Sequence, residues 1–358
     1  MLIVQDEKSP TLTRANGLGT LHRHRKGTVL NHPQAWAVIL AGGDGTRLRA
    51  LTQLISGEDR PKQYCPLYGG KTLLAQTRSR VDRAIHPERT VFVVVKSHEK
   101  FYRHQLADVE PSRLVVQPAN KGTTAAVICS LLRITSLAGD PGDPVIAFFP
   151  TDHYYSNEAR FIASVHRAVR VAQQHSDTVV VLGAEPEHAE VEYGWIEPST
   201  RFNSRFTNGL RRVNRFWEKP PHPTAQALLA RGCLWNTFVM IGRASIFLEM
   251  LNKTAAPGVL QAFTAARRDA GDATNWTAQD KLWATLTAGD FSRQVLSVST
   301  QNLAVLRVGD VGWSDLGTPE RVRSAMARSG LRSPWQESDE NENVKDHPTV
   351  RPDLTCSP

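Results

Sequence analysis

One segment constrains the fold of this chain more than any other: a short apolar run, residues 36–40, that leads into a cluster of glycines. An uninterrupted apolar run of this length is typical of a buried strand. Gly42, Gly43 and Gly45 follow it, and glycine adopts positive φ and lets a ligand approach the backbone closely. Arg47 then adds a cation where a helix is expected to begin. A strand, a glycine loop and a helix N-terminus in this order predict a binding site for an anion such as phosphate.

The two common phosphate-binding loops do not match this segment. A P-loop ends in Gly-Lys-Ser or Gly-Lys-Thr, and that ending is absent from this loop. The dinucleotide-binding fingerprint needs a third glycine, but Gly45 is followed by Thr46, Arg47 and Leu48. The missing fingerprint argues against a dehydrogenase. A tight turn between a strand and a helix, with an incidental arginine, remains the alternative to a phosphate site.

Apolar runs alternate with amphipathic segments along most of the chain. The expected strands are 36–40, 90–95, 113–118, 144–152, 178–183 and 303–308, and the expected helices are 123–137, 158–174, 244–252, 259–270, 278–288 and 318–329. Continuously apolar strands that alternate with helices predict an α/β fold whose parallel sheet is covered on both faces. Ligands bind at the carboxyl ends of the strands in such sheets, so the polar residues just after those strands are the candidates for function.

Three short aromatic segments interrupt this alternation, at 192–198, 213–220 and 234–242. Turn residues bound each of them, and they predict strands and loops of a lid-like extension from the sheet. The catalytic domain is expected to occupy residues 35–330. The polar stretches on either side of it, 1–34 and 331–358, predict a disordered basic arm and a disordered polar tail.

The net charge of the chain indicates which classes of partner it can bind. The 358 residues include 43 Lys and Arg against 35 Asp and Glu, which gives a net charge of +8. A basic surface attracts nucleic acid, an anionic membrane or small phosphorylated ligands. Much of the excess lies in the predicted arm, and nothing else in the sequence resembles a nucleic-acid-binding module. We therefore expect small phosphorylated ligands as partners, with no nucleic acid and no membrane.

Cysteine usage and hydropathy favour a cytoplasmic protein. The four cysteines show no Cys-x-x-Cys spacing, which argues against a zinc site or a disulfide framework and fits a reducing compartment. No apolar run approaches the roughly 18 residues that span a bilayer, and the N-terminus lacks the apolar core of a signal peptide. The sequence leaves the oligomeric state open, a homo-oligomer included.

Eight motifs, in order and at plausible spacing, point to one family: AGGDGTRL, RPKQ, QPANKGTTAA, FPTDH, EYGWIEP, FWEKP, LWNTF and GWSDLGTP. From about Trp36 to Val322 the chain resembles the sugar-1-phosphate nucleotidylyltransferases, and among them most the mannose-1-phosphate guanylyltransferases. The resemblance implies a Rossmann-like α/β domain with a mixed, mostly parallel central sheet and a small sugar-binding extension. It also implies that a nucleoside triphosphate and a sugar 1-phosphate react, with Mg²⁺, to a nucleotide-sugar and pyrophosphate.

Such a reaction must bring two anions together. Two unit charges ~4 Å apart repel by about 4 kcal/mol at an effective dielectric constant near 20, so cations must offset the repulsion. We expect Arg47 and the glycine loop to hold the triphosphate. Lys62, in RPKQ, is expected to neutralise the reacting phosphates, and Lys219, in FWEKP, to hold the sugar phosphate. The alternative for both lysines is an ordinary surface position, which their proximity to proline and tight turns disfavours.

Two acids that follow predicted strands are the candidates for Mg²⁺. Asp152 comes directly after the apolar run 144–150, and Asp315 lies in a turn after the strand 303–308. Two carboxylates from distant positions, together with phosphate oxygens and water, complete the octahedron that Mg²⁺ requires. A helix N-cap for Asp152 and a turn-forming role for Asp315 are the alternatives.

The remaining site residues follow from the resemblance. The residues implied at the nucleotide are Leu40, Ala41, Gly42, Gly43, Gly45, Thr46, Gln117 and Gly122, and those implied at the sugar are Tyr193, Gly194, Glu218 and Asn236. Gln117 offers a donor and an acceptor to a base edge, although a strand-end hydrogen bond is its alternative role. Some family members carry glutamate at this position, and the serine–acid–aromatic motif of the family has a different order here, at 290–292, so no role is assigned to it.

Two further functions stay open at this stage. One is the same chemistry with glucose 1-phosphate or another hexose phosphate and with UTP or dTTP. The other is a non-catalytic regulatory protein that binds a nucleotide-sugar, because such families contain inactive subunits. Retention of Arg47, Lys62, Asp152 and Asp315 together argues against the second function, since a sensor does not need a complete set for metal binding and phosphate transfer.

Overall fold

The computed structural model describes residues 35–139, 142–200, 209–254, 283 and 286–330. The arm and the tail predicted at the two ends lie outside these residues. So do the helix expected at 259–270 and most of the helix expected at 278–288.

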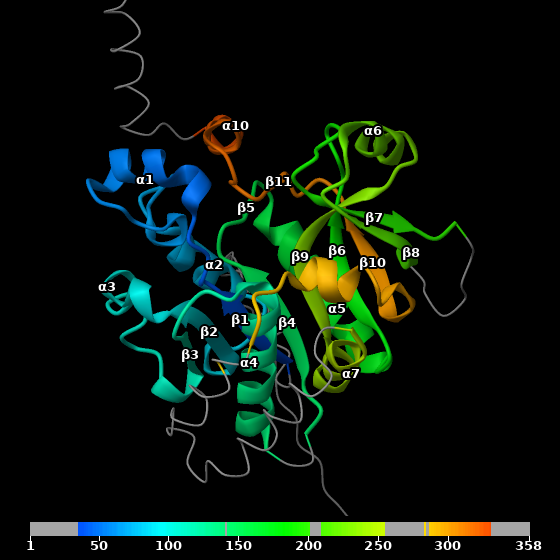
Figure 1. Ribbon diagram of the computed structural model, residues 1–358, viewed down its shortest axis with the longest axis horizontal. Coiled ribbons are helices and arrows are strands. Elements are labelled where there is room, and N and C mark those ends of the chain that lie inside the picture. The colour runs from blue at the N-terminus through cyan, green and yellow to red at the C-terminus, as the bar shows by residue number, and fades with distance from the viewer. Residues whose placement is uncertain (1–34, 140–141, 201–208, 255–282, 284–285, 331–358) are drawn as a thin grey trace, which may run out of the picture.

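A nine-stranded sheet forms the centre of the described part of the chain, with the order β3-β2-β1-β4-β9-β6-β10-β8-β7 (Figure 1). Its strands are β1 (Ala35–Leu40), β2 (Thr90–Val95), β3 (Leu114–Gln117), β4 (Val145–Pro150), β6 (Val179–Ala184), β7 (Gly194–Pro198), β8 (Leu210–Glu218), β9 (Leu234–Arg243) and β10 (Leu303–Val308). A separate two-stranded ribbon pairs β5 (Tyr154–Tyr155) with β11 (Trp313–Ser314). The predicted α/β class and the mixed central sheet are confirmed.

The pairing directions differ in part from the prediction. Strands β3, β2, β1 and β4 are parallel neighbours, as are β6 and β10. Strand β9 runs antiparallel between β4 and β6, β8 is antiparallel to β10 and β7, and β7 also pairs antiparallel with the start of β9. The sheet therefore contains more antiparallel strand pairs than we expected from the prediction of a mostly parallel sheet.

The segment 234–242 lies inside the sheet, not in a lid-like extension. It forms β9, in which the side chains on both faces are buried along almost the whole strand. Its short length, aromatic residues and flanking turns predicted a part of the extension, but long-range pairing with β4 and β6 determines its place. Strands β7 and β8 follow β10 in the sheet, and β7 returns to pair with the start of β9, beside α6 (His222–Ala230) (Figure 1).

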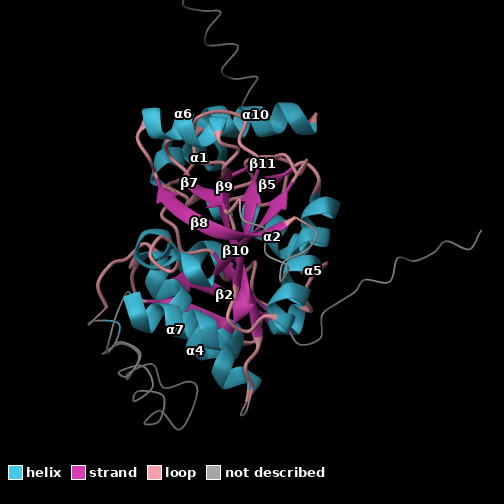
Figure 2. Ribbon diagram, turned by 90° about the vertical axis from the view of Figure 1, so that its right-hand side faces the viewer, coloured by secondary structure: helices cyan, strands magenta, loops and turns pink. Residues whose placement is uncertain are grey.

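Helices cover both faces of the sheet (Figure 2). The other helices are α1 (Arg49–Ser56), α2 (Leu73–Val81), α3 (Glu99–Tyr102), α4 (Gly122–Ala138), α5 (Glu158–Gln174), α7 (Ala244–Thr254) and α10 (Pro319–Ser329). Alternate residues of β1 explain the layers: Ala37 and Ile39 belong to the core that α2 and α5 close, and Val38 belongs to the core that α4 and α7 close. Helix α5 has the predicted bounds, and Asn157 caps it by accepting a hydrogen bond from the Arg160 N–H at 3.1 Å.

One edge of the sheet gathers strand ends that are far apart in the sequence. The parallel strands β1, β3 and β4 end there. Antiparallel β9 begins at the same edge, because Asn236 near its start pairs with Gly183 near the end of β6. Polar residues from both strand directions therefore meet at this edge.

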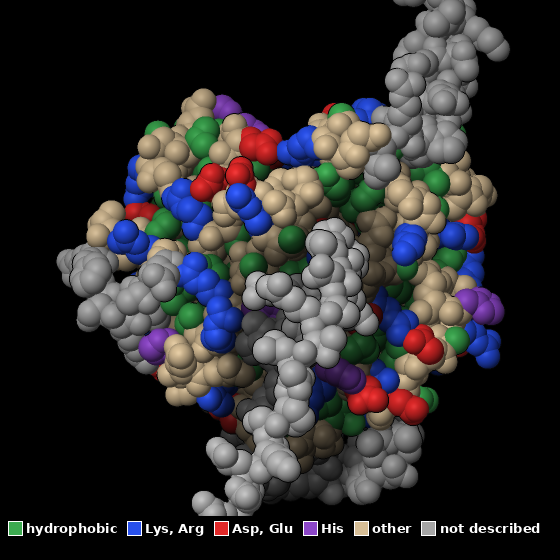
Figure 3. All heavy atoms as spheres, turned by 180° about the vertical axis from the view of Figure 1, so that it is seen from behind, with side chains coloured by type: hydrophobic (Ala, Val, Ile, Leu, Met, Phe, Trp, Pro, Cys, Tyr) green, Lys and Arg blue, Asp and Glu red, His purple; other side chains and the backbone are tan. Residues whose placement is uncertain are grey.

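The charge distribution on the surface and the hydropathy of the helices bear on the partners that the sequence predicts. On the face seen from behind, Lys and Arg are spread among Asp and Glu, without a single band of one charge (Figure 3). Among the described residues, none of the helices has the length and apolar character needed to cross a membrane.

We expect Leu182→Ala to lower the free energy of unfolding by about 2–5 kcal/mol, because it leaves a cavity in the core at β6, where Leu182 is fully buried. Urea unfolding at 25 °C measures the change. Leu54→Ala is the matched control, since Leu54 is 57% exposed on α1, and it is expected to change stability by less than about 0.5 kcal/mol. Equal losses in the two variants would contradict the described position of β6.

Candidate active site

The glycine loop after β1 is held in place by two side chains from the segment 61–64. Gln63 donates its amide N–H groups to the backbone oxygens of Ala41, at 3.0 Å, and Gly43, at 2.7 Å. The Tyr64 hydroxyl donates to the same Ala41 oxygen at 2.8 Å. Both side chains are fully or almost fully buried. These bonds occupy the carbonyl groups of the loop and fix its conformation.

Gly45 lets this segment come close to the loop. Its φ is +63°, and a Cβ built on it would lie 2.9 Å from the backbone nitrogen of Lys62. A larger residue would be strained by its backbone angle and would push the lysine away. The glycine is therefore required for the position of Lys62, and not only for access of a ligand to the loop.

Lys62 joins the two predicted acids. Its Nζ lies 2.8 Å from Asp152 Oδ2. The same ammonium donates to the backbone oxygens of Asp315, at 3.3 Å, and Leu316, at 3.4 Å. The turn after β4 and the turn after β11 thus meet at one largely buried cation.

The Asp152 carboxylate is ionised in this setting. Burial opposes its ionisation, but the charge of Lys62 and the hydrogen bond from Lys62 outweigh burial and lower the pKa of Asp152. Burial lowers the pKa of His153 to about 4, against the pull of Asp152 and Asp315. His153 is therefore a neutral neighbour, and Lys62 supplies the charge that Asp152 needs.

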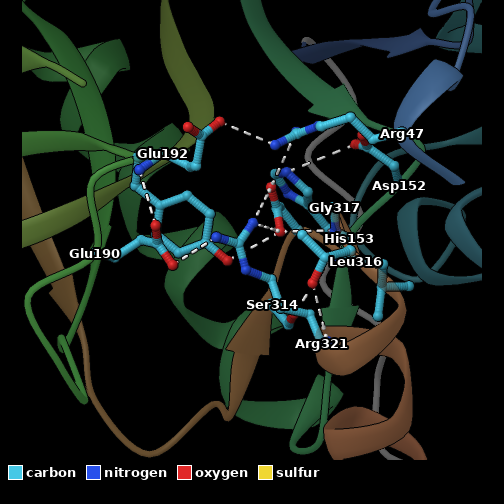
Figure 4. Close-up of polar contacts among 12 residues, drawn as sticks. Arg47, Asp152, His153, Glu190, Glu192, Ser314, Leu316, Gly317 and Arg321 are labelled. Atoms are coloured by element: carbon cyan, nitrogen blue, oxygen red, sulfur yellow. Dashed lines mark hydrogen bonds and ion pairs between the residues drawn. The ribbon is translucent and has the colours of Figure 1, made fainter.

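The Asp315 carboxylate accepts hydrogen bonds from three groups (Figure 4). They are the Tyr193 hydroxyl at 2.9 Å, the Gly317 N–H at 2.9 Å and Arg321 Nη1 at 3.0 Å. Arg321, on α10, also pairs with Glu190 and lies over the Tyr193 ring at 4.4 Å. This clamp fixes the orientation of the Asp315 carboxylate, while Lys62 contacts the backbone oxygen of the same residue.

Arg47 lies on the exposed side of the same group. Its Nη1 donates to Glu192 Oε2 at 3.1 Å, and its Nη2 is 3.9 Å from Asp315 Oδ2. About half of each side chain of the Arg47–Glu192 pair is exposed. Arg47, which we expect to bind phosphate, therefore extends from the end of the glycine loop to Asp315.

The two acids suit a divalent cation that is also bound by a substrate. Within the described residues, no group of three or more His, Cys, Asp or Glu side chains is arranged to hold a metal ion. Asp152 and Asp315 supply two hard oxygen donors at one cavity, and Mg²⁺ commonly takes only one or two carboxylates and completes its shell with phosphate oxygens and water. The donor set fits such a site and does not fit an all-protein cage.

A cavity of about 430 Å³ at this edge of the sheet contains most of the predicted site. The predicted residues that line it are Leu40, Gly42, Gly43, Arg47, Lys62, Gln117, Gly122, Asp152, Tyr193, Gly194, Glu218, Asn236 and Asp315. Four others do not line it: Ala41 is buried beneath the loop, Gly45 supports Lys62, and Thr46 and Lys219 are exposed. Lys219 has a φ of +48°, and its N–H donates to the Tyr193 carbonyl at 3.2 Å.

Gln117 offers an unused donor to one end of the cavity. Its side chain is buried, and its Nε2 has no hydrogen-bond partner among the described residues. A buried polar group without a partner costs free energy, so this donor is suited to a ligand. Its Oε1 lies against Gly42, where a Cβ would come within 3.2 Å. The amide therefore faces the cavity beside the glycine loop.

A second segment is fastened to the first turn of α4 at this end. Gly289 N–H donates to the Lys121 carbonyl at 3.0 Å, and Thr124 N–H donates to the Gly289 carbonyl at 3.1 Å. Gly122, with a φ of +80°, allows this approach, since a Cβ there would lie 2.3 Å from the Gly289 oxygen. Asp290, the next residue, lines the cavity.

Polar groups line the opposite end of the cavity. Gly194 lies against Glu218, where a Cβ would come within 2.9 Å of Oε2. Asn236 Oδ1 accepts a hydrogen bond from the Phe238 N–H at 3.0 Å, and Phe238 has a φ of +56°. Burial, and next the charge of Asp290, raise the pKa of Glu218 to about 7, although Lys219 and Arg293 oppose the rise.

Sequence patterns missed several residues of this site. Gln63 and Tyr64 are adjacent to the predicted Lys62, but nothing in the pattern showed that they bond to the glycine loop. Glu190 and Arg321 form the clamp on Asp315, and the spacing of Arg321, six residues after Asp315 and near the start of a helix, was the only signal for it.

Known proteins resemble this chain over most of its length. A family model described as nucleotidyl transferase matches residues 36–329. The xanthan biosynthesis protein XanB of Xanthomonas campestris pv. campestris is 31% identical over 299 residues, which cover 82% of this chain and 60% of that protein. The mannose-1-phosphate guanylyltransferase ManC of Salmonella typhimurium is 28% identical over 295 residues, which cover 81% of this chain and 59% of that protein. The chain thus spans about 60% of the length of these relatives.

A solved structure is also similar. The mannose-1-phosphate geranyltransferase from Thermus thermophilus aligns with a TM-score of 0.67 at 26% sequence identity. The alignment covers 81% of this chain and 79% of that chain. The similarity therefore extends over most of both folds.

Glu218 gives a prediction on pH. Its pKa in the folded chain is about 7, above the ordinary value of 4.5, so its proton stabilises the fold. This contribution is complete below pH 4.5 and is lost as the pH rises through 7. We expect Glu218→Gln to become more stable relative to the unchanged protein between pH 5 and pH 8, in urea unfolding at steps of about one pH unit. A difference in stability that does not vary with pH would contradict the raised pKa.

Proposed function

We propose that this chain, which belongs to the nucleotidyl transferase family, transfers a guanylyl group from GTP to mannose 1-phosphate and releases pyrophosphate. The family resemblance predicted from the motifs is confirmed by the match over residues 36–329. The chain is accordingly a nucleotidyltransferase of the sugar-1-phosphate type. The choice of mannose and guanine is the part that we propose, supported by relatives that carry the name mannose-1-phosphate guanylyltransferase.

One observation carries the proposal: Arg47, Lys62, Asp152 and Asp315 meet at one cavity although they come from three regions that are distant in the sequence. A reaction between two phosphate anions needs cations where negative charge gathers, and acids that bind a metal ion where the phosphates meet. A binding protein without catalysis has no need for both sets at one point. The regulatory alternative is therefore disfavoured.

The reaction proceeds by one displacement at phosphorus. An oxygen of the sugar phosphate forms a bond to the α-phosphorus of the nucleotide while the bond between that phosphorus and the bridging oxygen to the β-phosphate breaks, and pyrophosphate leaves with the bond electrons. Arg47 and the free N–H groups of the glycine loop hold the β- and γ-phosphates. Lys62, already fixed between the two acids, offsets charge at the α-phosphate.

Mg²⁺ is proposed at Asp152 and Asp315. When bound, it would polarise the phosphate oxygens and neutralise part of their charge. The chain's own contribution is to keep Asp152 ionised and Asp315 oriented: Lys62 lowers the pKa of Asp152, and Tyr193 and Arg321 hold Asp315. The carboxylate oxygens of both acids are thus preorganised at the cavity.

The two ends of the cavity suit the two organic parts of the substrates. Gln117 and the backbone at Gly122 are proposed to contact the base. Glu218 and Asn236 are proposed to bind sugar hydroxyls, with Gly194 allowing close approach of the ring. Lys219 remains a predicted ligand of the sugar phosphate, and its side chain must turn inward from its exposed position to reach it.

The alternative substrates are a different hexose 1-phosphate and uracil or thymine as the base. Gln117 Nε2, which has no hydrogen-bond partner in the described part of the chain, is the specific observation behind the alternative base, because an amide pairs as well with uracil or thymine as with guanine. The reaction, the phosphate cations and the metal site would be the same in both cases.

A substrate panel tests the proposed specificity. Pyrophosphate release is measured with GTP, UTP, dTTP and ATP, each against mannose 1-phosphate and glucose 1-phosphate. We expect kcat/KM for GTP with mannose 1-phosphate to exceed every other pair by at least about tenfold, because buried polar groups left without partners penalise the wrong substrate. Turnover with another pair alone would refute the choice of base or sugar and leave the reaction class in place.

Asp315→Asn tests the metal site. The substitution keeps the size of the side chain and removes its charge, so we expect kcat to fall by about 10²–10³-fold while the midpoint of urea unfolding changes little. Asp310→Asn is the control, because Asp310 is an exposed acid five residues earlier that pairs with Arg160. A kcat of Asp315→Asn within about twofold of the control would remove Asp315 from the metal site.

A further inference from the structure

We propose that Glu192 is a positioning residue that holds the Arg47 guanidinium across the mouth of the cavity and competes with the triphosphate for it. The proposal rests on the proposed function, in which Arg47 binds the phosphates of the nucleotide. The Glu192 carboxylate determines how tightly a polyphosphate is held at this site.

The contact crosses the cavity between two parts of the fold. Arg47 follows the glycine loop of β1, and Glu192 precedes β7. The 3.1 Å bond between their side chains spans this gap, and both residues line the cavity (Figure 4). The Arg47 guanidinium lies between the carboxylates of Glu192 and Asp315. Its N–H groups must turn away from these carboxylates to bind phosphate.

Glu192 is the anchored member of the pair. Its backbone N–H donates to Glu190 Oε1 at 2.8 Å, and Arg321 on α10 holds the other oxygen of Glu190. Next along the chain, the Tyr193 carbonyl accepts the Lys219 N–H. Arg47 is instead attached by a long side chain to a short 3₁₀ turn, Thr46–Leu48. Exchange therefore moves the Arg47 side chain while the Glu192 segment stays in place.

Exposure and charge make the exchange feasible. The side chains of Arg47 and Glu192 are 49% and 47% exposed, and ion pairs in such positions are weak. A phosphate chain carries more charge than one carboxylate and accepts two guanidinium N–H groups at once, so it displaces Glu192. The carboxylate stays close by and repels the bound phosphates. The same competition acts on the leaving pyrophosphate.

Glu192→Gln tests the proposal because it keeps the shape of the side chain and removes its charge. We expect the dissociation constants of GTP and of inorganic pyrophosphate to fall by about two- to fivefold, and the KM for the sugar phosphate to stay unchanged. Binding is measured by calorimetric titration, with pyrophosphate as a probe that does not depend on the base. The gain should shrink in about 0.5 M salt, where charges are screened.

Two further variants make the result decisive. Glu185→Gln is the matched control, since Glu185 pairs with Arg307 at the same 3.1 Å with similar exposure, away from the cavity lining. It is expected to leave both dissociation constants unchanged. Arg47→Ala is expected to weaken pyrophosphate binding, and the midpoint of urea unfolding is expected to stay the same in all three variants.

The outcomes separate the inference from the function on which it rests. Unchanged or weaker pyrophosphate binding in Glu192→Gln, with weaker binding in Arg47→Ala, would overturn the inference and leave the proposed role of Arg47 intact. Unchanged binding in Arg47→Ala would overturn both. Tighter binding in Glu185→Gln as well would show a general effect of net charge and would also overturn the inference.

Discussion

The structure of the site depends on a single ammonium group, that of Lys62. Its side chain is only 12% exposed, and a cation in such a place must have partners. It finds them in Asp152 after β4 and in the backbone after β11, and its own position requires Gly45 at a positive φ. Three segments that are distant in the sequence are therefore brought together by one charge. Breaking one side of this arrangement leaves a buried charge unpaired, which is more costly than the pair is stabilising.

The mixed sheet explains how polar residues from strands of both directions come to line the cavity around Lys62. A purely parallel sheet brings only carboxyl ends to its ligand edge, whereas antiparallel β9 brings the start of a strand there as well. Asn236 thus lines the same cavity as Gln117, the last residue of β3, and Asp152, which comes after the end of β4. The clamp of Arg321, from the last helix, joins Asp315 to Glu190.

Many of the strands and helices could be predicted from the sequence, because they depend on local patterns. The strands at 90–95 and 303–308 and the helix at 158–174 have the predicted bounds, since continuous apolar runs and an amphipathic period define them. The candidate residues came largely from the motifs, and the structure places most of them at one cavity. The central place of β9, the bonds from Gln63 to the glycine loop and the clamp on Asp315 could not be predicted, because long-range pairing and side-chain direction have no local signature.

The bonds between the start of α4 and Gly289 bring the next residue, Asp290, to the cavity. After burial, the charge of Asp290 is the next cause that raises the pKa of Glu218. The region proposed for the base and the region proposed for the sugar therefore share one charged neighbour.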